Sequence, residues 1–215
     1  MKRVSILATA MVTGMFLASC GGGEAPKTVE PEAEMSAEDL LDEGTSAPAE
    51  AAVDAANSSV EWNGTMVGMY THTGTVNISE GVVSMENDVL SGGSFTVDLS
   101  TIAPTDDNFS EDGTKEKLVG HLSSPDFFDI ATYPTAQFVI TNVDIEGATI
   151  TGDLTIKGVT NSETLTDVVL SKETATATGK LVFNRQTYGL SYQMTMKDMV
   201  IGDDVELNVT IKLAM

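Results

Sequence analysis

Cysteine, histidine and basic residues are scarce in this chain. Of its 215 residues, one is a cysteine, Cys20, and two are histidines. A single cysteine excludes an intramolecular disulfide, and so few Cys and His residues predict no structural zinc site. The acids show no EF-hand spacing, so no metal site is predicted, although a calcium site of Asp and Glu alone stays open. Only 11 Lys and Arg face 32 Asp and Glu, a formal charge of −21. Such a chain repels phosphate backbones and anionic lipid head groups, so no nucleic-acid partner is expected.

Signatures of catalysis are also missing. The sequence contains no phosphate-binding loop, no dinucleotide fingerprint and no G-x-S-x-G nucleophile motif. The glycine-flanked serines of residues 91–94 are typical of a hairpin turn or a β-bulge. We therefore predict no catalytic residues and no enzyme. A lipid hydrolase or isomerase using His72 or His121 as a base is the least supported alternative.

The N-terminus has the pattern of an export signal. Lys2 and Arg3 precede a mostly apolar run over residues 4–17, which is too short for a membrane-spanning helix of about 20 residues. Leu-Ala-Ser then precedes Cys20, as in the cleavage site of bacterial lipoproteins. We predict a signal peptide over residues 1–19, lipidation of Cys20, and an exported, membrane-anchored protein, periplasmic or at the cell surface. The alternative is an ordinary signal peptide with a chance cysteine.

Residues 20–56 form a predicted acidic, disordered tether behind the lipidated cysteine. The stretch is rich in Ala, Glu and Pro, and Lys27 is its only base. It has too little apolar surface to offset the entropy of ordering. The membrane partner would then be held through the N-terminal lipid anchor alone, because the acidic domain is not attracted to anionic lipid.

From residue 57 to 215 the pattern has a period of two. His72, Val76 and Ile78 alternate with threonines and an asparagine, and similar runs recur up to Leu213. Gly81 and the pair at residues 87–88 indicate turns. About eight strands at spacings of roughly 8 to 15 residues predict one all-β domain, a closed antiparallel barrel whose sheet has no edges.

One helical insertion interrupts this alternation near residues 115–130. A short helix is expected to end at His121–Leu122, and Phe127 and Phe128 follow between two aspartates. Each ring gains about 1.5–3 kcal/mol on burial. The pair is therefore expected to fold back as a plug over one end of the barrel.

Several motifs resemble one bacterial family. HLSSPDFFD followed by YPTAQF at residues 121–138, GDLTIKGVT at 152–160, NRQTYGL at 184–190 and His72-Thr-Gly are similar to the YceI-like proteins. The resemblance implies a lipocalin-like barrel that binds polyisoprenoids or related long-chain amphiphiles in an elongated tunnel. It covers roughly residues 57–213 and is more specific for fold than for ligand.

The predicted ligand-binding residues combine inward strand positions with groups near the barrel mouth. Arg185 is in phase with Phe183, so its guanidinium should point inward and pair with Asp129, Asp153 or a ligand head group. Tyr188 and Tyr192 suit a barrel mouth. The full set is Trp62, His72, Val76, Phe95, Val97, Phe127, Phe128, Phe138, Ile140, Leu154, Ile156, Phe183, Arg185, Tyr188, Leu190 and Tyr192.

Two functions follow from this set. The first is a binding protein that sequesters or carries a long-chain isoprenoid, of quinone or polyprenol type, or a fatty-acyl amphiphile, with no other cofactor. The alternative is a structural or interaction module whose barrel is filled by its own side chains. The sequence leaves the ligand, the direction of transport and a homodimer open.

Overall fold

The computed structural model describes residues 48–192 and 200–214, which fall within the unit Thr45–Met215. The predicted signal peptide, Cys20 and most of the predicted tether lie outside the described residues. Within the described part, no helix has the length and apolar character needed to cross a membrane.

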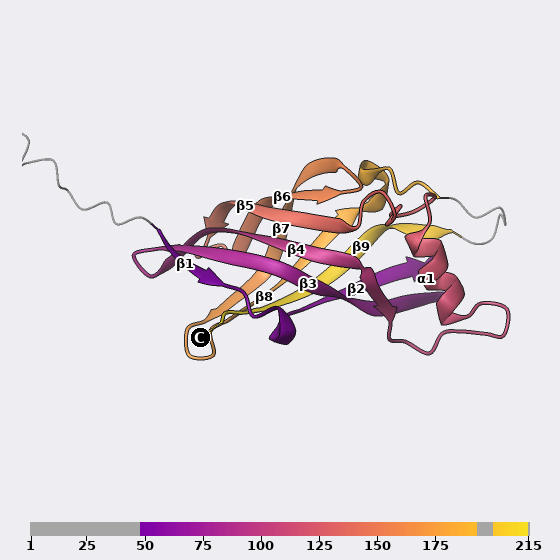
Figure 1. The fold of residues 1–215 in the computed structure, drawn as a ribbon, viewed down its shortest axis with the longest axis horizontal. Coiled ribbons are helices and arrows are strands. Elements are labelled where there is room, and N and C mark those ends of the chain that lie inside the picture. Colours follow the sequence, from indigo (N-terminus) through magenta and orange to yellow (C-terminus); the bar gives the residue numbers. More distant parts are fainter. Residues whose placement is uncertain (1–47, 193–199, 215) are drawn as a thin grey trace, which may run out of the picture. The chain divides into compact units, whose positions relative to one another are not determined.

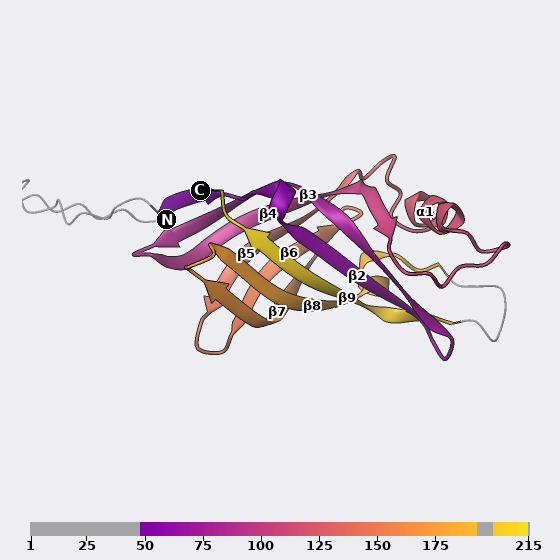
Figure 2. The same ribbon diagram turned by 90° about the horizontal axis from the view of Figure 1, so that it is seen from below.

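Nine strands form one antiparallel sheet, and eight of them close into a barrel (Figures 1 and 2). The closed ring runs β3-β2-β9-β8-β7-β6-β5-β4 and returns to β3, which confirms the predicted fold class. The strands are β1 (Ala49–Ala52), β2 (Ser59–Met66), β3 (Tyr70–Glu86), β4 (Val89–Pro104), β5 (Thr135–Asp144), β6 (Thr149–Ile156), β7 (Val159–Ser171), β8 (Thr176–Asn184) and β9 (Ile201–Lys212).

The sheet begins earlier than the boundary at residue 57 that the sequence predicts. β1 pairs with the C-terminal half of β3, and β2 pairs with the N-terminal half of β3. A 3-10 turn, η1 (Ala55–Asn57), links β1 to β2. An isolated bridge joins Val53 to Leu213 beyond β9. Residues 49–57 therefore extend the barrel wall beyond the N-terminal end of β2, although their composition indicates a tether.

Tight hairpins connect neighbouring strands. Asn87 and Asp88 both have positive φ and form a two-residue loop, and Lys157 and Gly158 do the same. This is the geometry of the type I′ turn, which matches the twist of paired strands. Gly81, however, is not a turn: it lies within β3 and pairs with Phe95 of β4, so that prediction was wrong.

A helical insertion covers one end of the barrel, as predicted. Helix α1 (Lys115–Ser123) begins at Thr114, whose side chain accepts a hydrogen bond from the Lys117 amide. The following turn is held by backbone bonds from Phe127 and Asp129 to the Ser124 carbonyl. Phe127 is buried and joins the core cluster, so the aromatic pair forms a plug.

The turns β3–β4, β5–β6 and β7–β8 lie at the opposite end of the barrel from α1, because the strands alternate in direction.

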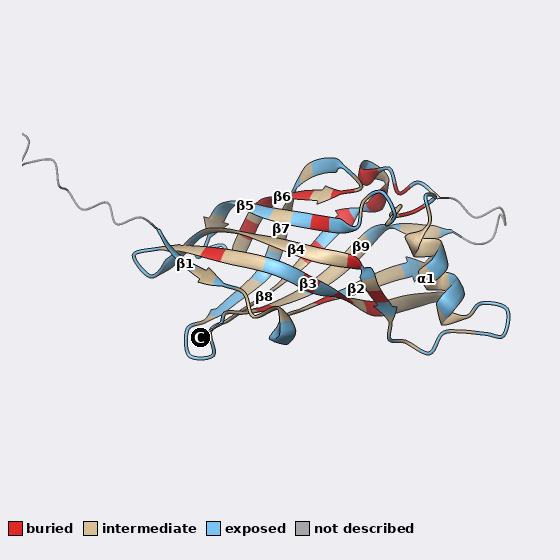
Figure 3. Cartoon of the chain, in the orientation of Figure 1, coloured by how far each residue is buried: buried red, intermediate tan, exposed pale blue. Residues whose placement is uncertain are grey.

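Inward and outward residues alternate along the strands (Figure 3). In β6, for example, residues 150, 152, 154 and 156 are buried while the residues between them are not. This alternation is the expected consequence of the pleat, and it gives the barrel an apolar interior.

Candidate functional site

An apolar cavity of about 620 Å³ occupies the barrel interior. At the end covered by α1, its wall includes His121 and Phe127. At the opposite end it includes Met85, next to the β3–β4 turn, and Leu170, next to the β7–β8 turn. The cavity therefore runs along the barrel, and its volume falls in the range of about 300–1,000 Å³ found for small-molecule sites.

The structure places the predicted ligand-binding residues on this wall, with three exceptions. The lining residues among them are Trp62, His72, Val76, Phe95, Val97, Phe127, Phe128, Phe138, Ile140, Leu154, Ile156, Phe183 and Arg185. They come from six strands, from the plug and from the turn after β8. Their position agrees with the strand alternation, while their contact with a ligand stays a prediction.

Two aromatic side chains lie flat against the wall because glycines oppose them. A Cβ built on Gly74 would lie 2.2 Å from the Trp62 ring, and one on Gly152 would lie 2.4 Å from the Phe138 ring. Each ring thus occupies the place of the missing side chain on a neighbouring strand. Large residues that would otherwise fill the interior are held aside, which leaves room for the cavity.

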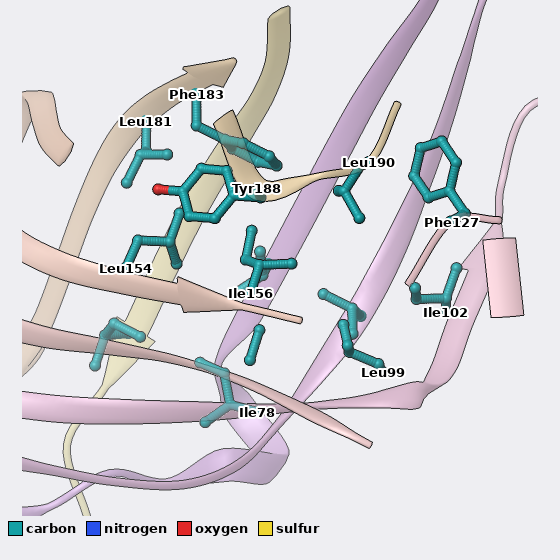
Figure 4. Packing of buried hydrophobic residues seen from close by; sticks show 14 residues of the cluster. Ile78, Leu99, Ile102, Phe127, Leu154, Ile156, Leu181, Phe183, Tyr188 and Leu190 are labelled. Atoms are coloured by element: carbon teal, nitrogen blue, oxygen red, sulfur yellow. The ribbon is translucent and has the colours of Figure 1, made fainter. Parts of the chain in front are cut away.

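Tyr188, Leu190 and Tyr192 are the exceptions. The turn η2 (Arg185–Tyr188) follows β8 and ends at Gly189, which has the left-handed conformation, so strand alternation does not apply beyond Asn184. Tyr188 and Leu190 are fully buried in the side-chain core (Figure 4), and the Tyr188 hydroxyl donates to Glu163 at 2.8 Å. Burial, with this bond, raises the pKa of Tyr188. These residues pack the barrel end instead of lining the cavity.

Arg185 is buried, but its partner differs from the one expected. It belongs to η2 instead of a strand, and its Nη2 donates to Asp203 at 2.9 Å, not to Asp129 or Asp153. The other guanidinium bonds go to four carbonyls, those of Leu190, Tyr192, Ile201 and Gly202. Five N–H donors thus meet five protein acceptors, so the group ties η2 to the start of β9.

His72 is likewise engaged by the protein. Its Nδ1 lies 3.1 Å from the Asp106 carboxylate, and its ring stacks on Phe109 at 4.7 Å. Burial alone would raise the pKa of Asp106, but bonds from the Thr73 and Asn108 amides and from the His72 ring lower it below its ordinary value of 3.8. The histidine therefore anchors the loop between β4 and α1.

His121 is different, because its Nε2 atom is buried and has no hydrogen-bond partner among residues 48–192 and 200–214. Its ring lies edge-to-face against Tyr192 at 4.2 Å and Phe127 at 5.8 Å. Burial lowers the pKa of His121, and nearby Asp126 opposes this only in part. Burial thus disfavours the charged form of this imidazole, which lies on the cavity wall near the plug.

Sequence reasoning missed other lining residues. Leu118 and Leu122 of α1 face the cavity, and their spacing of four residues is the signal that could have found them. Met85, Leu90, Val168 and Leu170 extend the wall toward the opposite end. Within the described residues, no group of three or more Asp, Glu, His or Cys could hold a metal ion.

A closed antiparallel barrel with an apolar cavity along its interior defines a lipocalin-like class of protein. The chain belongs to the YceI-like domain family, whose sequence profile matches residues 52–213. It is 32% identical over 130 residues to a UPF0312 protein of Pseudomonas putida, a match that covers 58% of this chain and 64% of that relative. A UPF0312 protein of Staphylococcus aureus is 29% identical over 126 residues, covering 54% of this chain and 70% of the relative.

A solved structure has the same fold. The crystal structure of BcnA from Burkholderia cenocepacia is similar with a TM-score of 0.58 and 23% identity, and the match covers 76% of this chain and 99% of that one. At this identity, the likeness concerns the arrangement of the strands.

Proposed function

We propose that this protein is an extracytoplasmic, lipid-anchored binding protein that sequesters or carries a long-chain isoprenoid or fatty-acyl amphiphile in its barrel. The observation that carries the proposal is the elongated apolar cavity of about 620 Å³ inside a YceI-like barrel. Hydrocarbon chains match such a wall, because each buried methylene gains about 0.8 kcal/mol.

The size of the cavity favours a carrier over a barrel filled by its own side chains. The protein's own side chains leave about 620 Å³ of apolar interior unfilled, so the wall lacks contacts that a packed core would have. A guest chain would supply these contacts, which stabilise both the guest and the barrel.

The anchor is the second part of the proposal. The apolar run before Cys20 supports cleavage and lipidation at that residue, and the acidic stretch behind it would let the barrel reach lipid without adhering to it. Metabolic labelling with a fatty acid, followed by detergent-phase partition, tests this. Labelling of the wild type and its loss in Cys20→Ala are expected; equal labelling of both would contradict lipidation at Cys20.

Ligand binding is tested through Trp62, the only tryptophan, which lies on the cavity wall. Titration of delipidated protein with a quinone carrying an isoprenoid tail should quench Trp62 emission to saturation near one equivalent. The same head group without the tail is the control, and it should quench weakly. No saturable response to any long-chain probe would contradict the carrier function.

A further inference from the structure

The polar groups on the cavity wall near the plug fall into two kinds. His72 bonds to Asp106, and the five donors of Arg185 are all matched by protein acceptors. His121 presents a buried Nε2 that forms no hydrogen bond with any residue that the structure describes. It is the one buried side-chain nitrogen or oxygen without a hydrogen bond in the part of the chain that the structure describes.

An unpartnered buried polar atom costs about 1–3 kcal/mol, so the fold holds this imidazole at a real expense of stability. The ring is also fixed in orientation, since Tyr192 and Phe127 contact it edge-to-face and the His121 carbonyl accepts from the Ser124 amide. A polar atom held in place on an apolar wall is the arrangement by which binding sites orient amphiphiles.

The geometry points to His121 as the residue that binds the head of the ligand: its Nε2 forms a hydrogen bond with an uncharged carbonyl or hydroxyl oxygen at the end of the guest chain. This inference rests on the proposed function and adds to it the orientation and head-group class of the guest. The head lies under the plug next to α1, and the tail runs toward the β3–β4 and β7–β8 turns.

The charges around the cavity favour a neutral head over an anion. Of the charged residues on the wall, Arg185 is saturated, and Lys172 and Asp88 lie at the opposite end. Burial lowers the pKa of His121, which disfavours the charged form of its ring. Among the described residues of the wall, none at the plug end is a cation free to pair with a phosphate or carboxylate, so desolvating such an anion there is costly.

Three probes with the same branched carbon skeleton separate these effects: geranylgeraniol with a hydroxyl, geranylgeranyl phosphate with an anion, and the saturated alkane phytane with no polar group. Each is titrated into delipidated full-length wild type and into His121→Leu, with Trp62 emission as the readout. His121→Gln, which keeps a hydrogen-bonding group, is the matched control. Circular dichroism verifies that the variants fold.

Wild type is expected to bind geranylgeraniol more tightly than geranylgeranyl phosphate, with an affinity for the phosphate that is at least tenfold lower. His121→Leu should weaken geranylgeraniol binding about tenfold, the value of one buried hydrogen bond. It should leave phytane binding unchanged or tighter, and His121→Gln should restore part of the loss.

Equal losses for geranylgeraniol and phytane, or no loss for either, would overturn the assignment of His121. Tighter binding of the phosphate would overturn the neutral head. Absence of binding by all three probes in wild type would contradict the proposed function itself, so the two failures are distinguishable.

Discussion

Replacement of Ala136 by leucine tests whether the barrel interior is hollow. Ala136 lies on β5 opposite Val97, is only 8% exposed and lines the cavity. Leucine adds three carbon atoms, and in an open cavity their burial is worth about 2.4 kcal/mol at about 0.8 kcal/mol each. For a domain of this size that raises the melting temperature by about 5–10 °C. The same volume is taken from the guest, so affinity for a long-chain ligand should fall by up to about fiftyfold.

Thermal unfolding of delipidated protein by circular dichroism and titration of Trp62 emission measure the two effects. Ala103→Leu, the same change at an exposed position of β4, is the matched control and should alter neither. In a barrel already packed by its own side chains, the added carbons would cause strain and destabilise Ala136→Leu by about 1–3 kcal/mol. A lower melting temperature with unchanged ligand affinity would refute the hollow interior.

Three further predictions concern the wall and its supports. Leu154→Glu places a carboxylate on the apolar wall and should abolish ligand uptake. Val139→Glu, at a position 38% exposed on the outer face, is the control and should bind ligand as the wild type does in the same titration. Arg185→Lys leaves at most three donors for five acceptors and should lower the free energy of unfolding by about 2–3 kcal/mol in urea; an unchanged midpoint would show that the bond network does not hold η2. Asp106→Asn should cost about 1–2 kcal/mol at pH 7. Because the folded pKa of Asp106 is depressed, its stabilising effect is present above pH 3.8 and is lost as the pH falls through the lower folded value, so wild type and variant should converge below that value. A constant difference between them would contradict this linkage.

Much of the wall could be predicted from the sequence, because the pleat fixes it. Leu154 and Ile156 alternate with polar residues, so their inward direction follows once their segment is a strand. The plug at Phe127 and Phe128 followed from the cost of exposing two rings. A hollow interior came only from the resemblance to the family, since any small barrel has inward apolar residues.

The parts that could not be predicted depend on contacts between distant segments. β1 consists of alanines and one glutamate, a composition without strand propensity, and it is a strand because β3 extends past β2 and offers it a partner. The carboxylate that pairs with Arg185 comes from β9, and no pattern in the sequence links Arg185 to Asp203. Likewise, the fit of the Trp62 ring over Gly74 requires the exact register of β2 and β3.

Strand alternation stops predicting side-chain direction where β8 ends. Arg185 continues the parity of Phe183, but β8 ends at Asn184 and the chain turns at Arg185–Tyr188. Tyr188 and Leu190 are therefore buried in the core and do not lie on the cavity wall. A period of two places residues only as far as the strand persists, and the asparagine that caps this turn was the local sign that it stops.

The most direct test of the account is native mass spectrometry of the full chain purified gently from cells. A bound long-chain lipid should appear as a discrete added mass on the wild type and be absent from Leu154→Glu. Repeated detection of the bare protein mass for both proteins would contradict the claim that the barrel exists to hold a hydrophobic guest.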